Sequence, residues 1–175
     1  SGLTRTGWTH IVEVQPGAVL FYNSAAGTGA TAAIDSAGNV RPLKYMTGFA
    51  KGWTHIASGG DSMALFYNLY TGVGSTTRID SAGQLTSLKT YNFAPWGQIV
   101  GVGIGKLFLY SGTGDGVTAE MDYDGTYRTL KIYYGAFAKG WTNITSPSPG
   151  FLFFYNRSST EAALGQVDVG GNFQT

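Results

Sequence analysis

A tract of five residues recurs along this chain and constrains its fold more than any other feature. Gly7-Trp8-Thr9-His10-Ile11 returns at residues 52–56 and 140–144, and in altered form at residues 95–99. The four tryptophans therefore stand at a nearly constant spacing, at Trp8, Trp53, Trp96 and Trp141. A fixed period of this length is typical of solenoids and propellers, so both fold and function must be argued repeat by repeat.

The first repeat has the pattern of four short strands. Its apolar and β-branched runs are separated by turn signals, Pro16-Gly17 after the first run and Asp35-Ser36-Ala37-Gly38 after the third. The predicted strands are Trp8–Val14, Ala18–Asn23, Ala30–Ile34 and Asn39–Met46. The chain has 27 glycines and only 12% charged residues, which also favours short strands and tight turns over helices.

These repeats predict an all-β protein, a four-bladed β-propeller with four antiparallel strands in each blade. The second strand of each repeat is a nearly continuous apolar run, as expected for a blade that is buried on both faces. We expect one domain over residues 1–175, with repeats at about 8–52, 53–95, 96–140 and 141–175, the last completed by residues 1–7. On this count the chain is almost a whole ring, cut in the link between the last blade and the first.

Composition excludes several classes of function. A net charge of +1 gives no electrostatic case for nucleic acid as a partner. No apolar run reaches the roughly 18 residues of a membrane span. The chain has no cysteine, so it contains neither a disulfide nor a thiolate metal site.

The Gly-Trp start, the Leu20-Phe21-Tyr22-Asn23 centre and the D-x-x-G turn together resemble the repeats of tachylectin-2-like and tectonin-like propeller lectins. The resemblance covers the whole chain and implies sugar binding. Similar repeats follow the catalytic domains of secreted bacterial hydrolases, which implies a secreted, extracellular protein. Four blades would match the size of hemopexin-like rings, which are commonly closed by a disulfide. Closure of this cysteine-free chain must then rest on packing alone or on an oligomer.

The ligand-binding candidates are aromatic and polar residues at repeated positions. A tryptophan that opens a blade can stack on a sugar ring, or it can fill the gap between two blades. The polar residue two positions later can bind hydroxyl groups or satisfy nearby backbone, and the asparagine that ends the second strand can bind a ligand or form a turn. The predicted ligand-binding residues are Trp8, His10, Asn23, Trp53, His55, Asn68, Trp141, Asn143 and Asn156. The third repeat, with Trp96, Gln98 and Ser111, is the altered one, so we expect three good sites and one degenerate site.

Other polar positions have simpler explanations. The D-x-x-G turn accounts for the aspartates that end the third strands, Asp35, Asp80, Asp122 and Asp168. Arg78, Glu120 and Gln166 share one repeat position, and such scatter predicts a solvated, weakly constrained site. We expect no catalytic residues, no metal ligands and no cofactor, although the axial channel of a four-bladed ring could hold a cation on backbone carbonyls.

Polar residues that come in fours favour several weak, equivalent sites over one active site. The sequence therefore predicts a non-enzymatic, multivalent carbohydrate-binding propeller with sites between the blades and glycans or a glycoprotein surface as partners. The alternative is a protein-interaction or adhesion module of a larger secreted protein.

Overall fold

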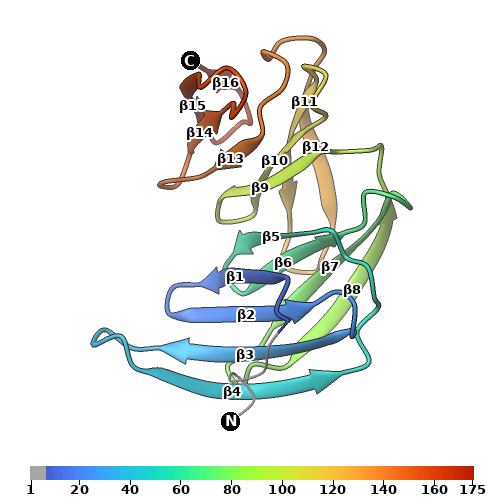
Figure 1. Ribbon diagram of the computed structural model, residues 1–175, viewed down its shortest axis with the longest axis vertical. Coiled ribbons are helices and arrows are strands. Elements are labelled where there is room, and N and C mark those ends of the chain that lie inside the picture. Colours follow the sequence, from blue (N-terminus) through green and yellow to red (C-terminus); the bar gives the residue numbers. More distant parts are fainter. Residues whose placement is uncertain (1–6) are drawn as a thin grey trace.

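The computed structural model describes residues 7–175 and consists of strands joined by turns, with no helix in that range. The strands form four separate antiparallel sheets, each with its strands in chain order (Figure 1). The first blade comprises β1 (His10–Gln15), β2 (Ala18–Asn23), β3 (Thr28–Ile34) and β4 (Val40–Thr47). The second comprises β5 (His55–Gly60), β6 (Met63–Tyr67), β7 (Val73–Ile79) and β8 (Leu85–Asn92). The third comprises β9 (Gln98–Gly103), β10 (Lys106–Tyr110), β11 (Gly116–Met121) and β12 (Tyr127–Tyr133). The fourth comprises β13 (Asn143–Thr145), β14 (Phe151–Tyr155), β15 (Ala162–Val167) and β16 (Phe173–Gln174).

The four-bladed β-propeller is thus confirmed, with strand boundaries within two residues of those predicted for the first repeat. The repeat boundaries stay a prediction, and the part of the last repeat assigned to residues 1–6 lies outside the described residues.

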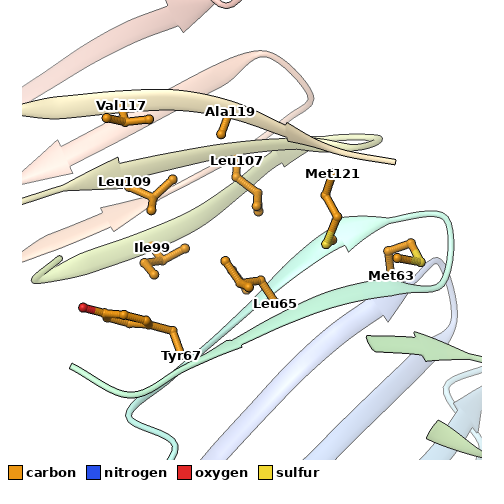
Figure 2. Packing of buried hydrophobic residues seen from close by; sticks show 10 residues of the cluster. Met63, Leu65, Tyr67, Ile99, Leu107, Leu109, Val117, Ala119 and Met121 are labelled. Atoms are coloured by element: carbon orange, nitrogen blue, oxygen red, sulfur yellow. The ribbon is translucent and has the colours of Figure 1, made fainter. Parts of the chain in front are cut away.

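Blades pack face to face through apolar side chains that alternate along their second and third strands. In the middle interface, Met63, Leu65 and Tyr67 of β6 meet Leu107 and Leu109 of β10 (Figure 2). The strands β6 and β10 are buried on both faces because each of these blades has a neighbour on either side. Each such interface buries apolar area from two sheets and holds the arc together.

Three such interfaces are present, and the ring is open between the fourth blade and the first. The buried apolar clusters lie between the first and second, second and third, and third and fourth blades. The first and fourth blades lie at opposite ends of the molecule's long axis (Figure 1). The closed ring that the repeat count predicts is therefore not formed by the described residues of one chain.

Candidate functional site

The polar residues that begin the inner strands join each blade to the next. His10 Nε2 lies 3.0 Å from the Thr54 carbonyl oxygen, and His55 Nε2 lies 3.0 Å from that of Gly97. Gln98 Nε2 donates to the Thr142 carbonyl oxygen at 3.1 Å. We call these three contacts the inter-blade latches. Burial of His55 in its latch lowers its pKa, since the charged form is desolvated there.

Asn143, the fourth member of this set, makes no such contact. Its Oδ1 accepts a hydrogen bond from Oγ1 of the preceding residue, Thr142, at 3.0 Å. Its side-chain amide therefore has no cross-blade partner among the described residues. The latches give three of the four repeated polar residues a structural role, and their binding of a ligand stays a prediction.

Three of the four tryptophans pack between blades. Trp53, Trp96 and Trp141 each lie against the apolar cluster that joins their blade to the preceding one. Trp8 has no preceding blade and packs on Phe21 of its own blade, with ring centroids 5.8 Å apart. Trp53 also lines a groove of about 490 Å³ between the first and second blades. Among the described residues that groove is lined by no carboxylate and no histidine, and it offers apolar contact, hydroxyl groups and the ammonium group of Lys44.

The asparagines that follow the second strands act locally. Asn23, Asn68 and Asn156 each accept, through Oδ1, the N–H groups two and three residues ahead. This is the Asx-turn arrangement, which fixes the loop between the second and third strands. Ser111 accepts N–H groups of its loop in the third blade through its hydroxyl. The structure thus gives these three predicted ligand residues a role in loop geometry.

The D-x-x-G turns are alike in the first, second and fourth blades and different in the third blade. Asp35 Oδ1 accepts the N–H of Ala37 and Asn39 at 2.9 and 2.8 Å. The hydrogen bond from the Asn39 side chain to Asp35 Oδ2, together with these backbone bonds, lowers the pKa of Asp35. Asp80 and Asp168 bond their turns in the same way. In the third blade, Asp124 Oδ1 instead accepts the Thr126 N–H, and the Asp122 carboxylate accepts no hydrogen bond from the described part of the chain. The turn therefore does not account for Asp122, contrary to the prediction.

A cavity of about 780 Å³ is lined by the inner edges of the first three blades and by the β13–β14 loop of the fourth, and we call it the central cavity. Glycines of β5 and β9 line part of it, and a Cβ added to Gly60 would lie 3.0 Å from Ile104 Cα of the third blade. The lining residues are Glu13, Gln15, Pro16, Ser58, Gly60, Asp61, Gly101, Gly103, Ile104, Ser146, Pro147, Ser148 and Pro149. A volume in this range suits a small organic ligand. The cavity carries two carboxylates, Glu13 and Asp61, and neither makes a hydrogen bond or an ion pair within residues 7–175.

Asp61 sits in a strained turn between β5 and β6. Three successive residues, Gly60, Asp61 and Ser62, have positive φ values of 65°, 47° and 66°. Asp61, Ser62 and Thr160 are the non-glycine residues of the described chain in this conformation, which costs L-residues of order 1–3 kcal/mol each. The turn is held by Ser62 Oγ, which donates to Gln15 Oε1 of the first blade. Strain kept at the cavity wall marks the Asp61 turn as a functional candidate.

Asp61 also lines a second, smaller cavity of about 270 Å³ between the second and third blades. Asp122 and Lys106 contribute to the walls of this space. The altered third blade therefore borders both cavities beside Asp61.

A row of charged residues crosses the third blade and has no counterpart in the other three. Lys106 of β10 pairs in register with Glu120 of β11, which pairs with Arg128 of β12. Lys106 Nζ lies 2.6 Å from Glu120 Oε2, and Arg128 bonds the other carboxylate oxygen. The Glu120 side chain is only 17% exposed. The prediction of a solvated, weakly constrained position is therefore wrong for Glu120, because sequence alone does not show which cross-strand partners a residue acquires.

Sequence reasoning missed Glu13, Asp61 and the serines of the central cavity. They belong to turns and inner-strand ends that differ between repeats, and the argument from repetition gave weight only to residues that recur. The signal that could have found them is the Asp61-Ser62 pair between two strands, where a two-residue hairpin turn favours glycine. Within residues 7–175, no group of three or more acidic or histidine side chains is placed to hold a metal ion. The same part of the chain contains no helix long and apolar enough to cross a membrane.

The chain resembles solved propeller structures over nearly its whole length. A candidate 6-phosphogluconolactonase from Bacteroides uniformis superposes with a TM-score of 0.63 at 12% identity, over 94% of this chain and 52% of that one. A candidate 6-phosphogluconolactonase from Bacteroides fragilis gives 0.59 at 16% identity, over 95% and 55%. The Pseudomonas aeruginosa periplasmic gluconolactonase gives 0.58 at 17% identity, over 94% and 51%. The chain thus spans about half the length of these proteins. No family model and no curated protein matches the sequence.

This likeness corrects the predicted function. The similar structures are described as lactonases and not as tachylectins, which overturns the prediction of a lectin-type binding module without enzymatic activity. At identities of 12–17% the shared property is the propeller fold. An activity for this chain must be argued from its own cavity.

Proposed function

We propose that this chain hydrolyses a sugar-acid lactone in its central cavity. The observation that carries the proposal is that cavity, because all four blades line it and it holds two unpaired carboxylates, Glu13 and Asp61. The description of similar propellers as lactonases supports this reaction class. The unique third blade supports it too, since an active site needs one constellation and not four equivalent ones.

Lactone hydrolysis requires a general base and polar side chains that bind the substrate. Asp61 carboxylate takes a proton from a water molecule while the water oxygen attacks the lactone carbonyl carbon. The ring C–O bond then breaks, and the departing ring oxygen takes the proton back from Asp61. The products are the open hydroxy acid and the regenerated carboxylate. Ser58 and Ser146 hydroxyls and Gln15 are placed to bond the hydroxyl groups of the substrate.

The charge of the cavity favours a neutral substrate over a phosphorylated one. Glu13 and Asp61 are acidic, and among residues 7–175 none that lines the cavity is Lys or Arg. A phosphate group placed there would meet like charge without a compensating cation. We therefore expect faster hydrolysis of an unphosphorylated aldonolactone than of its 6-phosphate.

The test is hydrolysis of δ-gluconolactone, followed by proton release with a pH indicator and corrected for spontaneous opening. We expect Asp61→Asn to lower kcat/KM by about 10²–10⁴-fold, the usual contribution of a general base. Asparagine tolerates the positive φ at this turn, so the variant keeps the fold. Asp35→Asn is the matched control, because it removes a carboxylate outside the cavity while keeping the oxygen that caps its turn.

The proposal fails if the protein does not accelerate the opening of either the neutral or the phosphorylated lactone. It also fails if Asp35→Asn lowers the rate as much as Asp61→Asn does.

A further inference from the structure

The fourth blade presents an apolar face that is buried in every other blade. Phe153 is 39% exposed, whereas Leu20, Leu65 and Phe108 at the same repeat position are fully buried. Leu164 is 57% exposed at the position where the other blades carry a threonine that is 1% exposed or less. We call this surface the forward face of the fourth blade. It is the side on which each earlier blade receives its successor.

The first blade presents the complementary side of the same interface. Ile11 is 64% exposed and Ile34 37%, while their counterparts Ile99 and Ile79 are 8% and 4% exposed. We call this surface the rear face of the first blade. It is the side on which each later blade meets its predecessor.

The glycines of the D-x-x-G turns also show that the first blade lacks a preceding blade. A Cβ added to Gly83 would lie 2.1 Å from Thr31 Oγ1 of the preceding blade, and one added to Gly125 would lie 2.6 Å from Thr76 Oγ1. A Cβ added to Gly38 would have no heavy atom within 4 Å. The first-blade turn therefore has the shape of a packed element but lacks the blade to pack against.

The hydrogen bonds between blades also stop at the fourth blade. Asn143 begins the inner strand of the fourth blade, and its amide nitrogen has no partner among residues 7–175, whereas the preceding blades reach a neighbouring carbonyl. The Tyr155 hydroxyl makes no hydrogen bond within residues 7–175, whereas Tyr22, Tyr67 and Tyr110 each donate to the link that leads to the next blade. Both the apolar and the polar parts of an inter-blade interface are thus present and unpartnered at the forward face.

We propose that a second copy of this chain closes the propeller, the forward face of each copy packing on the rear face of the other. The two contacts are equivalent, so the assembly is a closed dimer with two-fold symmetry and eight blades. One chain already contains this type of interface three times. It also presents the two faces, forward and rear, that a further interface of the same type needs. The solved propellers that it resembles are about twice its length, so two copies provide a comparable amount of ring.

The first test is the mass in solution, measured by light scattering after size exclusion at about 10 µM protein. We expect twice the 18.5 kDa of one chain. Phe153→Glu on the forward face and Ile11→Glu on the rear face should each weaken the dimer at least tenfold. Tyr70→Glu is the matched control, since Tyr70 is 86% exposed in a loop away from both faces, and it should leave the dimer intact.

Mixing the two variants tests the head-to-tail geometry. A mixed pair of Phe153→Glu and Ile11→Glu places both substitutions in one contact and leaves the other contact as in wild type. The mixture should therefore contain more dimer than either variant alone at the same total concentration. A wild-type monomer, dimerisation unchanged by both substitutions, or no recovery on mixing would each overturn the proposal, and none of these depends on lactone hydrolysis.

Discussion

We predict that the hydroxyl of Tyr67 contributes strongly to the stability of the fold. It donates to the Ala94 carbonyl oxygen at 3.0 Å and accepts the Trp96 N–H at 3.0 Å, so it ties the link between the second and third blades to the core. The Tyr67 side chain is fully buried. Tyr67→Phe keeps the ring and removes both bonds.

Each backbone group left without a partner costs about 1–3 kcal/mol when buried. Both groups are part-buried, so water satisfies them in part, and we expect a total loss of roughly 2–4 kcal/mol in the free energy of unfolding. For a chain of this length that corresponds to a fall in Tm of roughly 5–15 °C. The assay is urea unfolding followed by tryptophan fluorescence, with the midpoint compared at constant m-value.

Tyr155→Phe is the matched control. Tyr155 occupies the same repeat position in the fourth blade, but its hydroxyl has no hydrogen-bond partner within the described residues. Both tyrosine variants are compared in the Phe153→Glu background, which keeps the forward face uncovered, and there the removal of the Tyr155 hydroxyl should change the unfolding free energy by less than about 0.5 kcal/mol. Equal losses for the two variants, or a Tyr67→Phe protein as stable as wild type, would refute the reasoning.

Two further outcomes follow from the inter-blade contacts. Burial lowers the pKa of His55 below its usual 6.5, so the unfolded state binds more protons and the free energy of unfolding should fall as the pH drops below about 6.5. His55→Gln should make the free energy of unfolding depend less on pH in urea titrations at pH 5–7. An unchanged pH dependence would contradict this expectation. Gly83→Ala and Gly38→Ala both place alanine at a positive φ, near 80°, but only the first clashes with the preceding blade. Gly83→Ala should therefore cost about 1–3 kcal/mol more than Gly38→Ala in thermal unfolding, and equal costs would show that contact across the interface is unimportant.

The fold was largely predictable from the repeats, because turn residues and apolar runs are local signals. Pro16-Gly17 and the Asp35 turn mark strand ends in the sequence as they do in the structure. Closure of the ring was not predictable in this way. It depends on the angle between successive blades, which is set by the packing of side chains such as Leu65 against Leu107. The length of the repeat does not reveal that angle.

The candidate site was not predictable, for a different reason. Repetition draws attention to residues that recur, such as His55 and Asn68, and these serve the latches and the loops. Asp61 occurs once, and its place in the central cavity depends on how residues of four separate blades come together. Glu120 likewise owes its ion pairs to strand register, which the sequence does not show.

The latches also bear on how such a chain can diverge. In each one a side chain supplies the nitrogen, but the accepting group is a main-chain carbonyl, of Thr54, Gly97 or Thr142. Every residue type carries that carbonyl, so substitution at the accepting position leaves the bond available. Histidine and glutamine both fill the donating position. A mutation in one blade therefore needs no matching mutation in its neighbour, and the third blade could acquire its own charged row while remaining joined to the second and the fourth.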